Sequence, residues 1–267
     1  MKNKHSFLTF FLISLLGLSC VKVPITGRRQ TNLLPEVNLM SMALTNYNQI
    51  LTSSKVVSSG ANAESVKKVG EKISKAVTSY MNSHGYSKRV ANYKWEFNLI
   101  ENPTVNAWCM PGGKVAFYTG ILPICKDESG IAVVMGHEIA HAIARHGNER
   151  MSQLLLVQLG GITLDVATST KPNETRQLFQ LAYGVGSTLG IMLPYSRKHE
   201  SEADRMGIIF MAMAGYNPQE APAFWERMKN AGGAKVPELL STHPNPENRI
   251  KQLNKYMSEA LKYYKPN

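Results

Sequence analysis

The feature that most constrains this chain is a pair of histidines four residues apart, in the run His137-Glu138-Ile139-Ala140-His141. At about 3.6 residues per helical turn, His137 and His141 lie on one face of a helix and point both imidazoles at one ion. Glu138 lies beside that ion, where it can act as general base on the water that a catalytic zinc activates. The flanking residues are apolar, and unpaired imidazoles there would be costly without a metal. The motif therefore predicts a zinc hydrolase, and two histidines capping a core helix are the weaker interpretation.

A catalytic zinc usually has three protein ligands and one open position. Candidates for the third ligand are Glu200, Glu202 and Asp204. Glu200 and Asp204 share a helix face, whereas Glu202 points away from it. We assign Glu200 to zinc and Asp204 to the second N–H of a ligating histidine; a solvated charge cluster is the alternative. His146 also follows the motif, but on a continuous helix it would point away from His137, which argues against ligation.

Apolar periodicity predicts an α+β fold. The expected helices cover 35–51, 63–80, 127–145, 194–214, 218–231 and 247–264, and the expected strands cover 93–99, 106–110 and 114–119. The first helix would bury Met40, Leu44, Tyr47 and Leu51. Asp127 or Ser129 would cap the histidine helix, and Gly147 would stop it. The sequence therefore predicts a mostly helical zincin-type domain with a small sheet beside that helix, and a hairpin turn at 111–113.

The first twenty residues have the pattern of an export signal. Lys2 and Lys4 precede an apolar run over 7–18, which is too short to span a bilayer at about 20 residues per crossing. Small and apolar residues then lead to Cys20, as in bacterial lipoproteins, so we expect a lipid on this cysteine. An ordinary signal peptide with an incidental cysteine is the alternative. The expected division is a signal peptide, a polar tether and a metallopeptidase domain, over 1–19, 20–34 and 35–267.

Two further cysteines, Cys109 and Cys125, lie in the expected domain. An exported chain can hold a disulfide, and the two would meet if the chain folds back between them. We favour buried free thiols, which behave as small apolar side chains.

The charge of the chain and its distribution indicate which classes of binding partner to expect. Lys and Arg number 30 against 19 Asp and Glu, for a net charge of +11. The excess is spread along the chain, and the lysines of the 63–80 helix lie mainly opposite its apolar face, as on a solvated surface. The sequence therefore predicts no nucleic-acid partner and a membrane partner through the lipid anchor.

A polar stretch over 168–175 predicts a loop within the apolar segment 152–193.

Several stretches of the sequence outside the histidine motif also match one particular family of metallopeptidases. The chain resembles the zinc metallopeptidases of the CAAX prenyl endopeptidase and HtpX lineage, a gluzincin group, and within it the small periplasmic lipoprotein branch. The matching stretches, besides the motif itself, are 23–30, 106–108, 111–113, 196–204, 242–244 and Arg249.

This resemblance implies a zinc-dependent endopeptidase with one zinc ion per chain. It implies His137, His141 and Glu200 as the ligands, and Glu138 as the base. It places Asn106 and Ala107 on the strand beside the cleft, where a substrate can pair by adding a strand. The implied substrates are misfolded or misassembled envelope proteins. The implied location is the periplasmic face of the bacterial outer membrane, with its assembly machinery as a partner.

A cation or imidazole near the oxyanion would complete such a site, and His243 and Arg249 are the candidates. His243 has a second role open to it. It could occupy the open position of zinc at rest, as a histidine at this motif is thought to do in similar periplasmic relatives. We favour this latch over the oxyanion role; a plain loop residue is the third interpretation.

Two other functions fit the residues less well. A non-enzymatic zinc-bound chaperone or assembly factor of the envelope has no need of a general base, so Glu138 argues against it. A peptidoglycan-cleaving metalloenzyme would use a different ligand spacing. The endopeptidase remains the function that the sequence favours.

Overall fold

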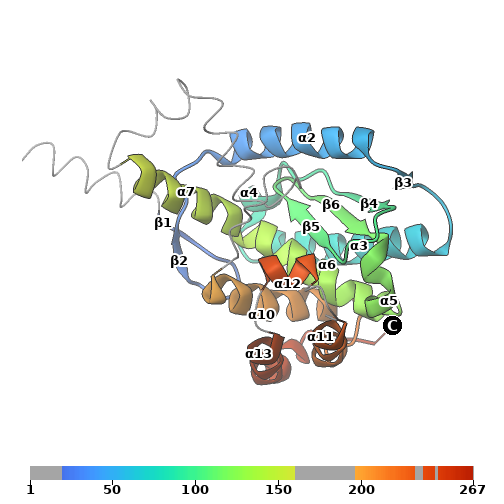
Figure 1. The fold of residues 1–267 in the computed structure, drawn as a ribbon. Coiled ribbons are helices and arrows are strands. Elements are labelled where there is room, and N and C mark those ends of the chain that lie inside the picture. Colours follow the sequence, from blue (N-terminus) through green and yellow to red (C-terminus); the bar gives the residue numbers. More distant parts are fainter. Residues whose placement is uncertain (1–19, 160–195, 232–236, 244–245, 267) are drawn as a thin grey trace, which may run out of the picture.

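The computed structural model describes residues 20–159, 196–231, 237–243 and 246–266. Helices predominate around a small central sheet, so the predicted α+β class is confirmed (Figure 1). The expected signal peptide and the expected loop at 168–175 lie outside the described residues. Among the helices that are described, none is both long and apolar enough to cross a bilayer.

The elements follow one another in this order: β1 (Cys20–Lys22), β2 (Arg29–Thr31), α2 (Glu36–Ser53), β3 (Val56–Val57), α3 (Ala61–Ser83), α4 (Ser87–Val90), β4 (Glu96–Ile100), β5 (Ala107–Met110), β6 (Lys114–Tyr118), η1 (Thr119–Ile121), α5 (Leu122–Cys125), α6 (Glu128–Ala144), α7 (His146–Leu159), α10 (Arg197–Met213), α11 (Glu220–Asn230), α12 (Glu238–Thr242) and α13 (Pro246–Ala260). The helices and strands predicted from periodicity are present at slightly different bounds.

The central sheet has the strand order β3-β4-β6-β5. β4 and β6 pair in parallel, and β5 and β6 form the predicted antiparallel hairpin. Gly112 and Gly113 in its turn both have a φ of 83°, in the left-handed region that glycine adopts without steric cost. A Cβ on Gly113 would also lie 2.6 Å from the Trp95 ring. The turn therefore needs glycine, and β5 forms an outer edge of the sheet.

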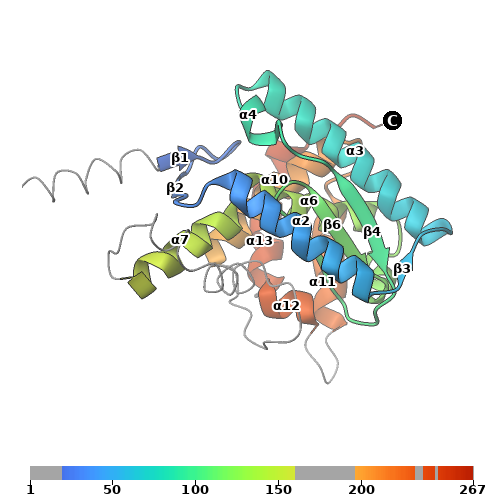
Figure 2. The same ribbon diagram turned by 90° about the horizontal axis from the view of Figure 1, so that it is seen from above.

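The two faces of the sheet carry separate apolar cores. Trp108 and Met110 of β5 pack with Tyr47 of α2, whereas Ala107 and Cys109 point to the opposite core, which α3 and α6 share. This alternation is the period of two expected of a strand. Figure 1 shows α2 on one side of the sheet with α3 and α6 on the other, and Figure 2 shows α2 crossing over the strands. Cys109 and Cys125 are both free and buried, as the favoured interpretation predicts.

Helix α6 carries the histidine motif through the middle of the molecule. Asp127 caps it as predicted, because its side chain accepts a hydrogen bond of 3.0 Å from the Gly130 N–H. The predicted end of this helix near Arg145 is confirmed to within one residue, but Gly147 is not the residue that stops it. Arg145 adopts the left-handed conformation, with a φ of 59°, which ends α6 two residues earlier. His146 then begins α7, so it does not continue the face of α6.

Helix α10 lies against α6 on the side away from the sheet, with α11 and α13 beyond it (Figure 1). Gly136 and Gly207 let the two backbones approach closely, since a Cβ on Gly136 would lie 2.6 Å from the Gly207 carbonyl oxygen. A glycine inside a helix costs about 1 kcal/mol relative to alanine, and the close packing offsets that cost. The contact brings the histidine motif beside the acidic residues of α10.

The predicted polar tether over 20–34 is wrong for most of its length. β1 and β2 pair as an antiparallel hairpin, and Val23 between them is fully buried in the core that α3 and α6 share. Gln30 and Leu34 are also buried. Strands of three residues are too short to reveal a period of two, so the pattern looks like an extended polar segment.

Helices α2 and α12 also differ from the sequence predictions. The buried face of α2 consists of Leu39, Ala43 and Tyr47, whereas Leu44, predicted to be buried, is 44% exposed. α12 lies where no helix is expected, because five residues cannot display helical periodicity. Its importance is that His243 follows it directly.

Candidate metal centre

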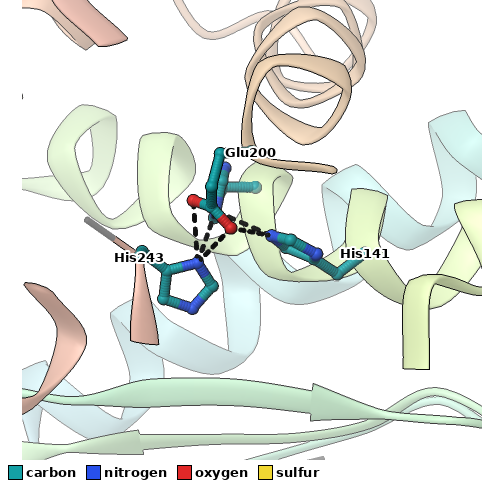
Figure 3. Close-up of side chains that lie close together, drawn as sticks. His141, Glu200 and His243 are labelled. Carbon is teal, nitrogen blue, oxygen red and sulfur yellow. Dashed lines mark hydrogen bonds and ion pairs between the residues drawn. The ribbon is translucent and has the colours of Figure 1, made fainter. Parts of the chain in front are cut away.

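Four buried side chains converge between α6, α10 and the end of α12: His137, His141, Glu200 and His243. One ligand atom from each lies within 4.8 Å of the others, so the group could hold a metal ion. Each of the four residues is only 3% exposed. Figure 3 shows the Glu200 carboxylate directed at the rings of His141 and His243.

The separations of the donor atoms fit a tetrahedral metal. The Nε2 atoms of His137 and His141 are 3.0 Å apart, and Nδ1 of His243 lies 3.2 Å from His137 Nε2. The Glu200 oxygens lie 3.0 Å from His243 Nδ1 and 3.3 Å from His141 Nε2. Zinc with bonds of about 2.0–2.1 Å separates tetrahedral ligand atoms by about 3.4 Å. The donor set therefore fits zinc in both chemistry and spacing.

Each donor is placed by a local feature of its element. His137 and His141 are one turn apart on α6, and Glu200 lies in the first turn of α10. Ser196 caps α10 by accepting a hydrogen bond of 3.2 Å from the His199 N–H. His243 is placed by its own backbone, whose N–H donates to the Leu239 carbonyl at 2.8 Å. The structure thus brings the three predicted ligands together and adds His243 as a fourth donor.

Burial and neighbouring charge set the protonation of this group. Burial lowers the pKa of His141 well below its ordinary value, which favours the neutral imidazole that a metal requires. Burial alone would raise the pKa of Glu200, but its electrostatic interactions with His243 and Arg249 keep it well below its usual range. Glu200 is therefore an ionised carboxylate, which suits a ligand for a cation.

Glu138 lies beside the four donors. Its Oε1 atom is 3.6 Å from Nε2 of His243, and the residue is 4% exposed. Burial raises the pKa of this carboxyl group above its ordinary value. A carboxylate with a raised pKa accepts a proton more readily, which is the property that a general base needs.

Asp204 and Arg249 lie behind the His137 ring. The Oδ1 atom of Asp204 is 3.1 Å from His137 Nδ1, in the orientation predicted for a carboxylate that fixes a ligating histidine. Arg249 donates to Asp204 Oδ2 at 2.9 Å, pairs with Glu200 at 3.1 Å and lies 3.4 Å over the Trp225 ring. These contacts hold Arg249 against two carboxylates, and its predicted role as a donor to an oxyanion stays a prediction.

Asn106 and Ala107 lie where the outer strand β5 begins, next to α12. The Asn106 side chain donates to Glu238 at 3.1 Å, and the Leu239 N–H donates to the Val105 carbonyl, also at 3.1 Å. Both Asn106 and Ala107 are buried. The segment that carries His243 therefore contacts the strand predicted to receive the substrate, and the substrate-binding role of these two residues stays a prediction.

His146 contacts the centre although it is outside the group of four donors. On a continuous helix it would point away from His141, but the break at Arg145 turns it back. Its Nδ1 lies 2.9 Å from His141 Nδ1, and its Nε2 lies 2.9 Å from Glu202 Oε2. Burial lowers the pKa of His146 to about 4, so the ring is neutral at pH 7. The sequence signals a helix end close to this position through Gly147, but not the left-handed turn at Arg145 that redirects His146.

Comparison with known proteins identifies similar chains. The family model described as Peptidase family M48 matches residues 62–257. The chain is similar to the mitochondrial metalloendopeptidase OMA1 of Schizosaccharomyces pombe, with 39% identity over 173 residues, which are 64% of this chain and 49% of the relative. It is similar to human OMA1, with 33% identity, 65% of this chain and 34% of the relative.

A bacterial relative is the beta-barrel assembly-enhancing protease of Escherichia coli. It is 31% identical over 189 residues, which are 65% of this chain and 37% of the relative. The chain thus spans half or less of the length of these curated relatives. The aligned parts in all of them amount to about two thirds of this chain.

Proposed function

Because the chain belongs to peptidase family M48, we propose that it is a zinc-dependent endopeptidase with His137, His141 and Glu200 as metal ligands. The observation that carries this proposal is the convergence of buried imidazole nitrogens and a carboxylate at tetrahedral spacing, with Glu138 beside them. Nitrogen donors at this spacing favour zinc over magnesium or calcium, which prefer oxygen ligands.

The residues divide the chemistry of peptide hydrolysis among them. A bound zinc ion would lower the pKa of its water far below the ordinary value, to about 7, and would polarise the scissile carbonyl. The Glu138 carboxylate would take the proton from the attacking water and pass it to the leaving amine. Its raised pKa suits a group that holds this proton between the two steps. Asp204 holds His137 in orientation by accepting its Nδ1–H.

We further propose that His243 is a resting fourth donor that leaves when a substrate enters. Its Nδ1 lies among the other donor atoms, where it would occupy the position that a catalytic zinc keeps open. The α12 segment would have to move before hydrolysis begins, as gating segments do in other enzymes. This is the predicted latch, and the oxyanion role is its competitor.

The proposed activity is tested with an unfolded protein such as casein and the chain from Val21 onward. We expect cleavage, loss of cleavage after a chelator removes the metal, and recovery when zinc is added back. A second function, a zinc-bound envelope chaperone, is favoured by one observation: with His243 the site has four protein donors, as structural zinc sites do. A protein that holds one zinc per chain and never cleaves would support this second function.

The proposed location is the periplasmic face of the bacterial outer membrane, with a lipid on Cys20. The export pattern that ends at Cys20 supports it, as does the similarity to the beta-barrel assembly-enhancing protease of Escherichia coli. The proposed substrates are accordingly misfolded or misassembled envelope proteins, and the outer-membrane assembly machinery is the proposed partner. Other relatives are named as mitochondrial, so the compartment needs a test of its own.

That test replaces the cysteine. Cys20→Ala should move the protein from washed membranes to the soluble periplasmic fraction, because the lipid would no longer form. Immunoblots of the two fractions measure the shift, with the unchanged protein as the control. Retention of the variant in washed membranes would count against the lipid anchor.

A further inference from the structure

A second set of ionisable side chains, buried except for the partly exposed Arg28, lies directly beside the metal centre and has no part in the proposed chemistry. We call it the histidine–glutamate cluster; its members are Arg28, His146, Glu149, His199 and Glu202. The two histidine rings stack, with centroids 4.4 Å apart and planes at 21°. The two glutamates share Arg28, whose guanidinium lies 2.7 Å from Glu149 and 2.6 Å from Glu202.

One branch of this cluster reaches the metal centre through a fixed direction of hydrogen bonding. Glu202 Oε2 lies 2.9 Å from His146 Nε2. An ionised carboxylate can only accept, so His146 Nε2 carries the hydrogen and its Nδ1 is the acceptor of the neutral ring. That Nδ1 lies 2.9 Å from His141 Nδ1, which must therefore donate. The remaining nitrogen of His141, Nε2, then carries a lone pair, and this lone pair points to the position where the other metal donors converge.

Glu202 is itself held by the N-terminal hairpin. Arg28 Nε donates to Glu202 Oε2 at 2.8 Å, and the Thr26 hydroxyl donates to Oε1. Both residues follow β1 in the turn of the hairpin, more than 100 positions before the histidine motif. A segment remote in the chain thus contacts the carboxylate at the end of the relay.

The two ligating histidines of α6 therefore differ in their support. His137 faces the Asp204 carboxylate directly, with Nδ1 and Oδ1 3.1 Å apart. His141 has an imidazole between itself and its carboxylate. We propose that Glu202, held by Arg28, is a positioning residue that acts through His146 to fix the tautomer and ring orientation of His141. This proposal rests on the proposed zinc centre.

The test measures zinc affinity of the full chain by competition with a chromophoric chelator. Glu202→Leu removes the acceptor, and His146→Phe keeps the ring stacked on His199 but removes both nitrogens. Each should weaken zinc binding by about 10- to 100-fold, the range typical of lost supports for metal ligands. Glu202→Gln should restore most of the affinity. Because Arg28 donates to the same atom as His146, an amide oxygen must occupy that position.

Glu149→Gln is the matched control. Glu149 belongs to the same cluster and accepts from His199 at 3.0 Å, on the branch that does not lead to His141. It should lower the unfolding midpoint of the metal-free protein and leave zinc affinity unchanged. Equal loss of affinity in Glu149→Gln and Glu202→Leu would overturn the relay in favour of general destabilisation.

Folded Glu202→Leu or His146→Phe protein with normal zinc affinity would also overturn it. His146→Phe preserves the ion pairs of Arg28, so it decides the matter if Glu202→Leu fails to fold. The unchanged protein separates the two proposals. If it binds no zinc, the proposed function fails, whereas a normal parent with unaffected variants refutes the relay alone.

Discussion

Two clusters built from the same residue types lie side by side on α6, α7 and α10, and they differ in how their ring nitrogens are paired. In the metal centre, ring nitrogens face one another at 3.0 and 3.2 Å, with Glu200 ionised among them. In the histidine–glutamate cluster, each histidine has a carboxylate of its own, at 2.9 Å and 3.0 Å, whereas His141 and His243 share Glu200. Arg28 pairs with both carboxylates of the histidine–glutamate cluster.

The difference shows how histidine and glutamate acquire opposite roles. Three imidazole nitrogens that converge on one point favour a cation there, because their lone pairs repel and a single proton cannot satisfy several acceptors. Where each N–H has a carboxylate acceptor and an arginine supplies the positive charge, the network is satisfied without a metal. The metal centre also contains an arginine, Arg249, which pairs with Glu200 and Asp204. What separates the clusters is that three ring nitrogens and a carboxylate converge on one point only in the metal centre, among the residues that the structure describes. The predictions below test this contrast.

The largest effect, on turnover, should come from replacing Glu138, the proposed general base. Glu138→Gln removes the proton acceptor but leaves the donors in place, so turnover should fall by about 100-fold or more. Zinc content should stay at one per chain, measured by metal analysis beside a casein-cleavage assay. Near-normal turnover with a full complement of zinc would remove Glu138 from the mechanism.

The second effect concerns the arginine of the other cluster. Arg28→Met leaves Glu149 and Glu202 buried without their shared cation, and breaking such a buried pair should lower the free energy of unfolding by about 2–3 kcal/mol. Urea unfolding of the metal-free protein measures the change. Lys55→Met is the control, because the Lys55–Glu101 pair is exposed on both sides and should contribute almost nothing. If Arg28→Met and Lys55→Met lowered the free energy of unfolding equally, the ion pairs of Arg28 would contribute no more to stability than an exposed pair.

A third prediction uses pH. Burial would raise the pKa of Glu149 and of Glu202, but His199, His146 and Arg28 outweigh it and lower each to about 2. A pKa below the unfolded value means that the stabilisation is complete above about pH 4.5 and is lost as pH falls toward 2. We expect a loss of about 1–2 kcal/mol per carboxylate between pH 5 and pH 3, allowing for solvent screening.

Unfolding midpoints of metal-free protein across this pH range measure the loss. Glu149→Gln and Glu202→Gln should each flatten the dependence, because the glutamine does not titrate. A pH dependence that is unchanged in both variants would assign the acid sensitivity to other groups.

The smallest effect should come from His243. If it is the resting fourth donor, His243→Ala should keep zinc through the other three ligands and cleave unfolded protein severalfold faster. Casein cleavage beside zinc affinity measures this. Loss of turnover with zinc retained would favour the oxyanion role, and no change in either would make His243 a loop residue.

Much of the centre could be predicted from local sequence alone. The four-residue spacing in α6 fixes the common face of His137 and His141, and the same spacing in α10 pairs Glu200 with Asp204. Both statements need only helical geometry, so they hold wherever the helices pack. The glycine turn between β5 and β6 and the cap at Asp127 are local in the same sense.

Other parts depended on contacts between distant segments. The left-handed conformation of Arg145 turns His146 back to His141, although helical periodicity places it on the wrong side. The docking of the N-terminal hairpin brings Arg28 to Glu202, 174 positions away. The short helix α12 brings His243 to a motif about 100 residues earlier.

Local and long-range features differ in this way because the interactions behind them act over different distances along the chain. Periodicity and capping act over a few residues, so the sequence determined the faces of α6 and α10 and the chemistry of their side chains. Charge pairing, the close approach at Gly136 and Gly207, and the end of α6 act between elements. Only the tertiary structure decided which histidines converge on one metal-binding point and which pair with a carboxylate beside Arg28, because that depends on how distant segments pack together.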